Sequence, residues 1–374
     1  MQRPSRPTVA TIRLPNLASN LRLIQRRVGR GVGIMAVVKA NAYGHGMVPV
    51  SRYLEDHGIT AFGVAFAEEG ATLRAEGIRS SILVFALSHD AQADLCIRHR
   101  LEPTVATADS IRSLQRAAER RRCTVNVHLK IDTGMNRVGI RPDDVPAILR
   151  ELARARRLQV KGVYTHFATA DEPDSPFARE QIARFDRAVE SVIKAGVEPE
   201  VVHAANSGAI LHQPDAVYSI VRAGILMYGY SPSGPDDRTL AVRPALTWTT
   251  RVAMVKRIAA GESVSYGQRF RADRSTIIAT IPVGYADGLF RSLTGRGAGV
   301  LIHGRRFPIV GTICMDQCMV DCGEEDVRRG DEVVLIGRSK TESITAWDMA
   351  KIAGTIPYEV TCAISARVPR AYQS

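Results

Sequence analysis

The sequence predicts an N-terminal (β/α)8 barrel followed by a C-terminal, mainly β domain. Over about the first 230 residues, short β-branched runs alternate with amphipathic segments. The alternation repeats eight times, which is the pattern of a parallel barrel. Beyond residue 235 the chain changes to Val-, Ile- and Thr-rich runs separated by glycine-containing turns, which is typical of a β domain.

Eight segments have the short, apolar composition of buried parallel strands. Helical spacing separates them, for example at 67–77 and at 177–196, where Gly196 closes the second helix. A helix at 16–28, starting at Asn16, precedes the first strand. The strands are expected at 34–38, 61–65, 81–86, 103–106, 125–131, 160–165, 200–204 and 219–222.

A linker of composition S-P-S-G-P-D-D at 231–237 separates the two parts. We therefore expect the barrel over 12–235 and the β domain over 236–374. A strand at about 7–13, ahead of the barrel, is expected to belong to the β domain. The main β runs of that domain lie at 247–255, 275–283, 306–313 and 331–337.

The composition is that of a globular protein of 374 residues, 45% of them hydrophobic. No apolar run approaches the roughly 18 residues of a membrane helix, and the first ten residues are too polar for a signal peptide. We expect a cytoplasmic protein without a membrane partner.

The formal charge of +12 raises the possibility of a nucleic-acid partner. Only seven basic residues are lysines, however, and the 43 arginines are spread from residue 3 to residue 370. An arginine-rich, solvated surface is the favoured interpretation, and no nucleic-acid partner is expected.

The six cysteines include three spaced by four residues, Cys314, Cys318 and Cys322. No C-x-x-C pair accompanies them, and in one strand all three would point to the same face. Small core residues are the favoured interpretation, and no metal site is expected.

In a barrel, functional groups gather at the carboxyl ends of the strands. Lys39 follows the first strand there, where apolar surroundings favour a neutral amine that can act as a nucleophile or base. The alternative is a lysine that extends to solvent or is paired with another group. The other polar residues at these ends are Lys130, Asp132, His166, His203, the run Asn206-Ser207-Gly208, and Arg222 with Gly224.

Glycine-containing turns at 207–208 and 223–224 match the usual phosphate site of a barrel. A reactive lysine together with a phosphate site suggests pyridoxal phosphate. The chain has no G-x-G-x-x-G or P-loop motif, and its histidines form no compact metal motif.

The segment A-V-V-K-A-N-A-Y-G-H-G at 36–46 resembles the pyridoxal phosphate attachment segment of alanine racemases. The resemblance extends over essentially the whole chain, and that family's fold is a barrel followed by a β domain. Further matching segments are H-L-K-I-D-T-G-M-N-R-V-G (128–139), Y-T-H-F-A-T-A-D (164–171), A-A-N-S-G-A (204–209), V-R-A-G-I-L-M-Y-G (221–229), S-V-S-Y-G (263–267), P-V-G-Y-A-D-G (282–288), G-T-I-C-M-D-Q-C-M-V-D (311–321) and G-T-I-P-Y-E (354–359).

The resemblance implies two catalytic bases on opposite faces of the cofactor. Lys39 resembles the lysine that attaches the cofactor, and Tyr266 resembles the second base, which the partner subunit of a homodimer supplies. Hydrogen bonds are expected to lead from Tyr266 to His166 and on to Arg222, which faces the pyridine nitrogen and leaves it unprotonated.

The resemblance also implies binding residues. Tyr43, Ser207 beside Asn206, the amides of Gly224 and Ile225, and Tyr358 would hold the cofactor. The expected substrate and supporting residues are Arg137 and Met315 at the substrate carboxylate, Lys130 as a carbamylated support for Arg137, Asp316, and Tyr285 with Tyr358 at the entrance.

The implied reaction is the interconversion of L- and D-alanine, which supplies D-alanine for peptidoglycan. The alternatives are a broader or serine-preferring racemase of the same fold, a fold-related pyridoxal phosphate decarboxylase, and a carrier without catalysis. The decarboxylase would lack the tyrosine on the second face, and the carrier is usually only a barrel.

Overall fold

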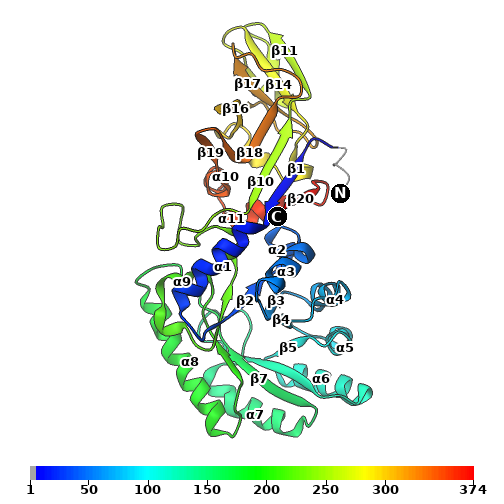
Figure 1. Ribbon diagram of the computed structural model, residues 1–374, viewed down its shortest axis with the longest axis vertical. Coiled ribbons are helices and arrows are strands. Elements are labelled where there is room, and N and C mark those ends of the chain that lie inside the picture. The colour runs from blue at the N-terminus through cyan, green and yellow to red at the C-terminus, as the bar shows by residue number, and fades with distance from the viewer. Residues whose placement is uncertain (1–5) are drawn as a thin grey trace. The chain divides into compact units, whose positions relative to one another are not determined.

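The computed structural model describes residues 6–374 and separates into two compact units (Figure 1). The barrel unit comprises Asn16–Ala42 and Met47–Arg243. The β unit comprises the N-terminal segment that ends at Pro15, the short segment Tyr43–Gly46, and Pro244–Ser374.

The barrel unit contains eight parallel strands in the order β8-β7-β6-β5-β4-β3-β2-β9. Backbone hydrogen bonds from Ser219 to Val202 (3.1 Å) and from Arg222 to Ala205 (2.9 Å) bring the two outer strands together, so the barrel is nearly closed. This confirms the predicted fold. The strands are β2 (Gly33–Val37), β3 (Ala61–Val64), β4 (Ser81–Leu87), β5 (Glu102–Val105), β6 (Val125–Lys130), β7 (Leu158–Tyr164), β8 (Val201–His203) and β9 (Ile220–Ala223).

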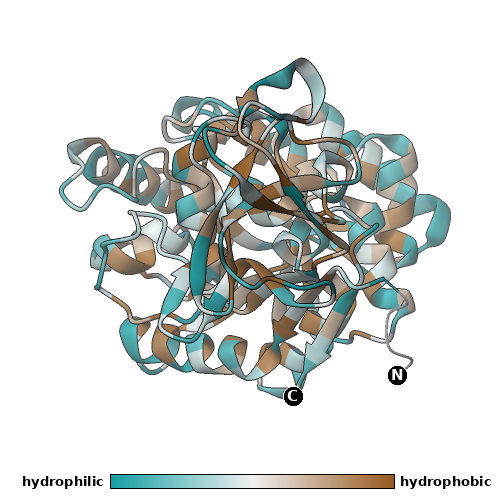
Figure 2. Cartoon of the chain, turned by 90° about the horizontal axis from the view of Figure 1, so that it is seen from above, coloured by the Kyte–Doolittle hydropathy of each residue, from teal (hydrophilic) through white to brown (hydrophobic). Residues whose placement is uncertain are grey.

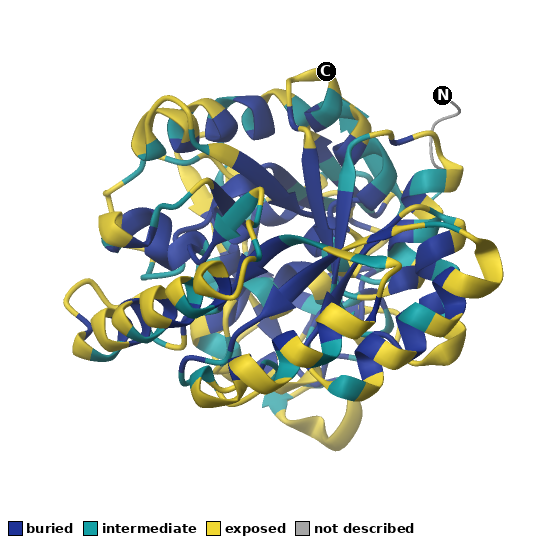
Figure 3. Ribbon diagram, turned by 90° about the horizontal axis from the view of Figure 1, so that it is seen from below, coloured by how far each residue is buried: buried dark blue, intermediate teal, exposed yellow. Residues whose placement is uncertain are grey.

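Amphipathic helices surround these strands. Figure 3 shows the strands largely buried and the helices exposed along their outer sides, and Figure 2 shows hydrophobic and hydrophilic stretches alternating along the outer helices. The α-helices are α1 (Leu14–Val28), α3 (Met47–Asp56), α4 (Ala67–Ala75), α5 (Asp90–Arg98), α6 (Ala108–Arg121), α7 (Val145–Arg154), α8 (Pro176–Lys194) and α9 (Ser207–His212). Short 3-10 helices are η1 (Pro142–Asp144), η2 (Pro214–Ala216) and η3 (Ile225–Tyr228).

Local sequence signals explain where helices begin and end. The Ser175 hydroxyl accepts a hydrogen bond from the Ala178 amide at the start of α8, and Gly196 adopts φ +81° just past its end. The predicted start of the first helix at Asn16 is wrong, because α1 begins at Leu14. Pro15 then lies in the first turn, where no intrahelical N–H donor is needed.

The β unit is built on one mixed sheet in the order β11-β14-β17-β16-β15-β18-β10-β1-β20, with β19 paired to β18. Strand β1 (Val9–Arg13) pairs antiparallel with β10 and parallel with β20. The other strands are β10 (Leu246–Arg251), β11 (Met254–Ile258), β12 (Ser263–Val264), β13 (Phe270–Arg271), β14 (Thr276–Ile281), β15 (Gly299–Ile302), β16 (Arg305–Val310), β17 (Cys318–Gly323), β18 (Glu332–Ser339), β19 (Glu342–Ile344) and β20 (Arg370–Gln373). Its helices are η4 (Tyr266–Gln268), η5 (Tyr285–Asp287), η6 (Arg291–Leu293), α10 (Ala346–Ala353) and α11 (Pro357–Ala363).

The three evenly spaced cysteines do not share a strand. Cys318 and Cys322 are buried on β17, where burial raises the pKa of the Cys322 thiol to about 11. Cys314 precedes that strand in a loop, so its expected place on the same face is wrong. Within residues 6–374, no helix combines the length and apolar character needed to span a bilayer.

Candidate active site

Lys39 begins a left-handed turn at the carboxyl end of β2, labelled α2 (Lys39–Tyr43). Ala40, Asn41 and Ala42 adopt φ values of 52°, 54° and 55°, and Tyr43 follows with 53°. A left-handed conformation costs roughly 1–2 kcal/mol for each residue with a Cβ atom. Such strain persists only where the surroundings hold the backbone, and it concentrates at functional sites.

Three hydrogen bonds hold this turn. The Ala42 amide donates to the Val38 carbonyl (2.8 Å), and the Ala40 amide donates to the Glu69 carboxylate (2.7 Å). The Asn41 side-chain oxygen accepts from the Met47 amide (2.8 Å). Lys39 is therefore attached to a backbone that is fixed on both sides.

Arg222 lies on β9, the strand next to β2, with Ala36 paired to Ala223. Its guanidinium is buried, and Nη2 donates to the carbonyls of Thr165 (2.7 Å) and Ala204 (2.8 Å). Burial lowers the pKa of Arg222 to about 10, so the group remains positively charged near neutral pH. The strand register thus places a fixed cation beside the strand that precedes Lys39.

Two histidines contact this guanidinium. The His203 Nδ1 atom lies 2.9 Å from Nη1 of Arg222, and the His166 Nδ1 atom lies 3.3 Å from Nη2. Burial, together with the neighbouring positive charges of Lys130 and Arg222, lowers the pKa of each imidazole well below its usual value. Both rings are therefore neutral, and each Nδ1 accepts from the arginine. The expected contact between His166 and Arg222 is present.

Lys130 ends β6 inside the barrel, with 7% of its surface exposed. Its Nζ atom lies 4.5 Å from the centre of the Tyr164 ring, whose hydroxyl is 2.7 Å from that of Thr104. Burial, reinforced by Arg222 and Arg137, lowers the pKa of Lys130 well below 10.5. Arg137 itself lies exposed in the loop that follows β6.

Ser207 and Gly224 join the two predicted phosphate turns. The buried Ser207 hydroxyl accepts from the Gly224 amide (3.0 Å), and Asn206 caps α9 by accepting from the Ala209 amide (3.0 Å). A side chain at Gly208 would approach the Asp171 amide to 2.6 Å, so the close packing of these turns requires glycine. Ile225 begins η3 directly after them.

Tyr43 and Tyr358 lie together within the β unit, with ring centres 5.9 Å apart. Burial, with a contribution from Tyr358, raises the pKa of the Tyr43 hydroxyl, which therefore stays protonated. A Cβ atom at Gly44 would lie 2.1 Å from the Thr361 carbonyl, so α11 packs directly on this segment.

Three connected segments of the β unit carry the other predicted residues: Tyr266 begins η4, Tyr285 begins η5, and Met315 and Asp316 lie in the loop before β17. The Thr312 hydroxyl donates to the Tyr266 carbonyl (2.8 Å), and the Tyr285 amide donates to the Cys314 carbonyl (3.0 Å). Asp316 pairs with Arg367 (2.6 Å). Tyr266, Tyr285 and Met315 are exposed by 72%, 40% and 52%, so this cluster presents aromatic and apolar side chains at the surface.

A polar network inside the barrel was not predicted from the sequence. His128 bridges His203 (3.1 Å) and Glu102 (3.0 Å), and Tyr164 stacks on His203 with ring centres 4.7 Å apart. One signal was available: in V-N-V-H-L-K the polar residues alternate with apolar ones, which places His128 and Lys130 on the same face of β6.

Comparisons with known proteins identify the family of the chain. The alanine racemase N-terminal domain profile matches residues 12–232, and the alanine racemase C-terminal domain profile matches residues 245–372. The chain is 46% identical to an alanine racemase of Symbiobacterium thermophilum over 368 residues, which cover 98% of this chain and 97% of the relative.

Solved structures show the same fold. The alanine racemase of Bacillus anthracis with bound L-Ala-P is 36% identical, with a TM-score of 0.95 over 100% of this chain and 96% of that one. A histidine racemase from Leuconostoc mesenteroides is 31% identical, with a TM-score of 0.91 over 100% of both chains. This chain belongs to the alanine racemase family and is an isomerase that acts on amino acids.

Proposed function

We propose that this enzyme interconverts L- and D-alanine with pyridoxal phosphate and two catalytic bases, Lys39 and Tyr266. The observation that carries the proposal is the pairing of β2 with β9, which puts the strand end of Lys39 beside the buried, charged Arg222. A nucleophilic amine and a fixed cation on neighbouring strands suit a cofactor that has a carbonyl group and a ring nitrogen.

The residues present fit the cofactor. Ser207 and the turn at Gly224 place a hydroxyl and backbone amides together, as an anion with several oxygens requires. Asn206, Ile225, Tyr43 and Tyr358 are proposed to complete this site. When bound, pyridoxal phosphate supplies an electron sink that makes the α-proton of an amino acid removable.

Arg222 is proposed to face the pyridine nitrogen. A guanidinium whose pKa stays near 10 even when buried does not give up its proton at neutral pH, so it would donate a hydrogen bond to the ring nitrogen of a bound cofactor without protonating it. His166 is proposed to link Arg222 to the phenol of Tyr266, because a phenol is protonated near neutral pH and needs such help to act as a base.

Racemisation requires one base on each side of the α-carbon, because the proton leaves from one face and returns to the other. Lys39 Nζ is proposed to exchange the proton on one face and Tyr266 Oη on the other. Tyr266 is 72% exposed in the single chain, as expected for a side chain that a second subunit covers. We therefore propose a homodimer with shared active sites.

Arg137 and the Met315 amide are proposed to hold the substrate carboxylate, with Asp316 supporting that loop and Tyr285 and Tyr358 narrowing the entrance. Lys130 has the lowered pKa that a reactive neutral amine needs. Its nitrogen would add to carbon dioxide and release one proton, which gives a carbamate that pairs with Arg137. Without the carbamate, Lys130 and Arg137 repel each other when both are charged.

The proposed physiological role is the cytoplasmic supply of D-alanine for peptidoglycan. A second candidate is the racemisation of another amino acid, because a histidine racemase has the same fold at 31% identity. The proposed narrowing of the entrance by Tyr285 and Tyr358 would favour the methyl side chain of alanine over an imidazole.

Two measurements test this proposal. Lys39→Ala should lose both the visible absorption of the bound cofactor and racemisation, and borohydride should label Lys39 in the unmodified protein. Turnover of both enantiomers of alanine, serine, lysine and histidine should favour alanine. Equal rates on serine or histidine would contradict the alanine assignment, and an unlabelled Lys39 would contradict the cofactor assignment.

A further inference from the structure

A continuous row of hydrogen-bonded side chains crosses the barrel interior from Arg222 to Glu102. Arg222 contacts His203 (2.9 Å), His203 contacts His128 (3.1 Å), and His128 contacts Glu102 (3.0 Å). Lys161 completes the row through an ion pair with the second oxygen of Glu102. His128, His203 and Arg222 are each at most 3% exposed.

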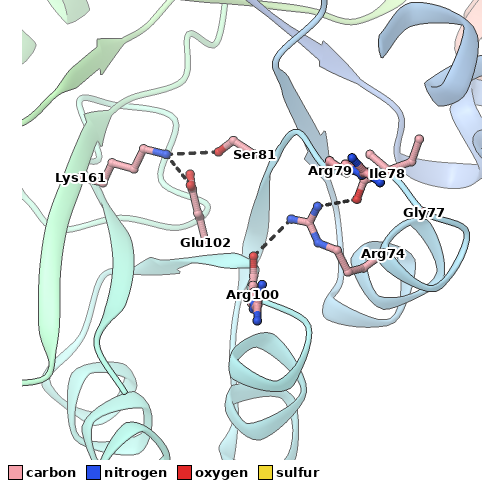
Figure 4. Close-up of a pocket in the computed structure, with 8 residues that line it drawn as sticks. All are labelled: Arg74, Gly77, Ile78, Arg79, Ser81, Arg100, Glu102 and Lys161. Atoms are coloured by element: carbon pink, nitrogen blue, oxygen red, sulfur yellow. Dashed lines mark hydrogen bonds and ion pairs between the residues drawn. The ribbon is translucent and has the colours of Figure 1, made fainter. Parts of the chain in front are cut away.

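The row ends at a cavity of about 700 Å³. Glu102 begins β5 and Ser81 begins β4, so this cavity lies at the amino ends of these strands, away from the strand ends that carry Lys39 and Lys130. Figure 4 shows Lys161 pointing toward Glu102 and Ser81 at this place. The remaining lining residues are Arg74, Gly77, Ile78, Arg79 and Arg100.

The proton of Arg222 fixes the direction of every hydrogen bond in the row. A guanidinium only donates, so His203 accepts at Nδ1 and carries its proton on Nε2. His203 Nε2 then donates to His128 Nδ1, and His128 Nε2 donates to Glu102. Every hydrogen bond in the row pairs one donor with one acceptor only if the Glu102 carboxylate is ionised and accepts. Lys161 also donates to this carboxylate.

We propose that Glu102, paired with Lys161, is a positioning residue for Arg222 that sets the tautomers of His128 and His203 from the opposite end of the barrel. The inference rests on the proposed function only in placing Arg222 against the cofactor. The row itself is a property of the chain. Hydrogen bonds from His128 and Lys161 outweigh burial and lower the pKa of Glu102 to about 2, which agrees with an acceptor that is always ionised.

Glu102→Gln tests the direction of the row. If the side-chain carbonyl of the introduced glutamine faces His128, its NH2 group faces the ammonium of Lys161, and two hydrogen-bond donors oppose each other. If the amide N–H group faces His128 instead, both histidines must change tautomer, and a proton on His203 Nδ1 meets Arg222. A second change, Lys161→Met, removes the first conflict and allows the carbonyl to face His128.

The experiment compares wild type, Glu102→Gln and Glu102→Gln/Lys161→Met as holoenzymes. Lys194→Met is the matched control, because Lys194 pairs with Glu190 on the exposed face of α8. The readouts are the ¹⁵N shifts of the histidine rings, the absorption maximum of the bound cofactor, and kcat and KM for alanine.

We expect Nε2–H tautomers for His128 and His203 in the wild type and in the double variant, and altered tautomers or a shifted absorption maximum in Glu102→Gln. The single variant should lose about 10–100-fold in kcat, the range seen when a residue that orients a metal-binding side chain is removed. KM should change less, and the double variant should recover most of the loss.

Wild-type tautomers and kcat in Glu102→Gln, or a loss that Lys161→Met does not reverse, would overturn the proposal. A wild-type protein whose His128 or His203 carries its proton on Nδ1 would also overturn it, even if the variant does not fold. Failure of the proposed function would instead appear as wild-type protein without a cofactor band or racemisation. The histidine shifts do not depend on that activity.

Discussion

Replacing Ala40 by glycine is expected to stabilise the left-handed turn after Lys39. Ala40 has φ 52° and ψ 51°, and its side chain is exposed, so the substitution removes backbone strain without loss of core packing. Relief of a left-handed Cβ contributes roughly 1–2 kcal/mol. Glycine also has more conformational freedom when the turn is unfolded, which offsets about 0.4–1 kcal/mol of this stabilisation. The turn should gain about 0.5–1 kcal/mol.

The Ala42 amide reports this local change, because it donates to the Val38 carbonyl inside the turn (2.8 Å). Its hydrogen-exchange protection should rise about two- to fivefold, which corresponds to the expected gain in free energy. Ala183→Gly is the matched control, since Ala183 lies exposed in the middle of α8. There the same substitution should cost about 1 kcal/mol and reduce protection nearby.

The two glycine substitutions should therefore have opposite signs. Reduced protection of Ala42 in Ala40→Gly, of the size seen near Ala183, would refute the argument that the turn is strained. Ala40→Val is a third variant for comparison, because a β-branched side chain is strongly disfavoured at positive φ. It should weaken the turn and lower the hydrogen-exchange protection of the Ala42 amide.

Three other predictions concern the two bases, the buried lysine and a buried carboxylate. Tyr266→Phe should slow α-deuterium exchange from L-alanine far more than from D-alanine, and equal slowing would contradict one base on each face. Removal of carbon dioxide and bicarbonate should lower the activity of the wild type but not that of Lys130→Met, and ¹³C NMR with labelled bicarbonate should show a carbamate only in the wild type. Asp287 is fully buried and bound by the partly exposed Arg6, so Asp287→Asn should cost roughly 2 kcal/mol at pH 7. The pKa of Asp287 lies below 3.8 in the folded protein, so its stabilisation is present above pH 3.8 and is lost as the pH falls through the pKa of the folded state. Calorimetry of the wild type and Asp287→Asn should therefore show that their stabilities converge at low pH.

Much of the barrel follows from local sequence. Runs such as 81–86 are β-branched and apolar because these strands are buried on both faces, and the observed β4 spans Ser81–Leu87. The position of Lys39 directly after such a run, and the glycines at 208 and 224, indicated the end of the barrel where the chemistry is proposed. These features depend on residues close together in the chain.

The sequence did not indicate the left-handed turn. A-N-A-Y contains no glycine, and its positive φ values depend on hydrogen bonds to Glu69 and Met47, which the folded chain brings close. The start of α1 at Leu14 and the position of Cys314 in the loop before β17 were also not predicted.

The sequence by itself determined the barrel, the family and the residue types at the proposed site. Only the tertiary structure decided which polar side chains meet inside the barrel. Glu102, His128, His203 and Arg222 come from four strands, and their contacts depend on registers such as Thr104 opposite His128 and Tyr164 opposite His203. Periodicity places each residue on an inner face, but the stagger between strands sets its height along the barrel, and no local pattern encodes that stagger.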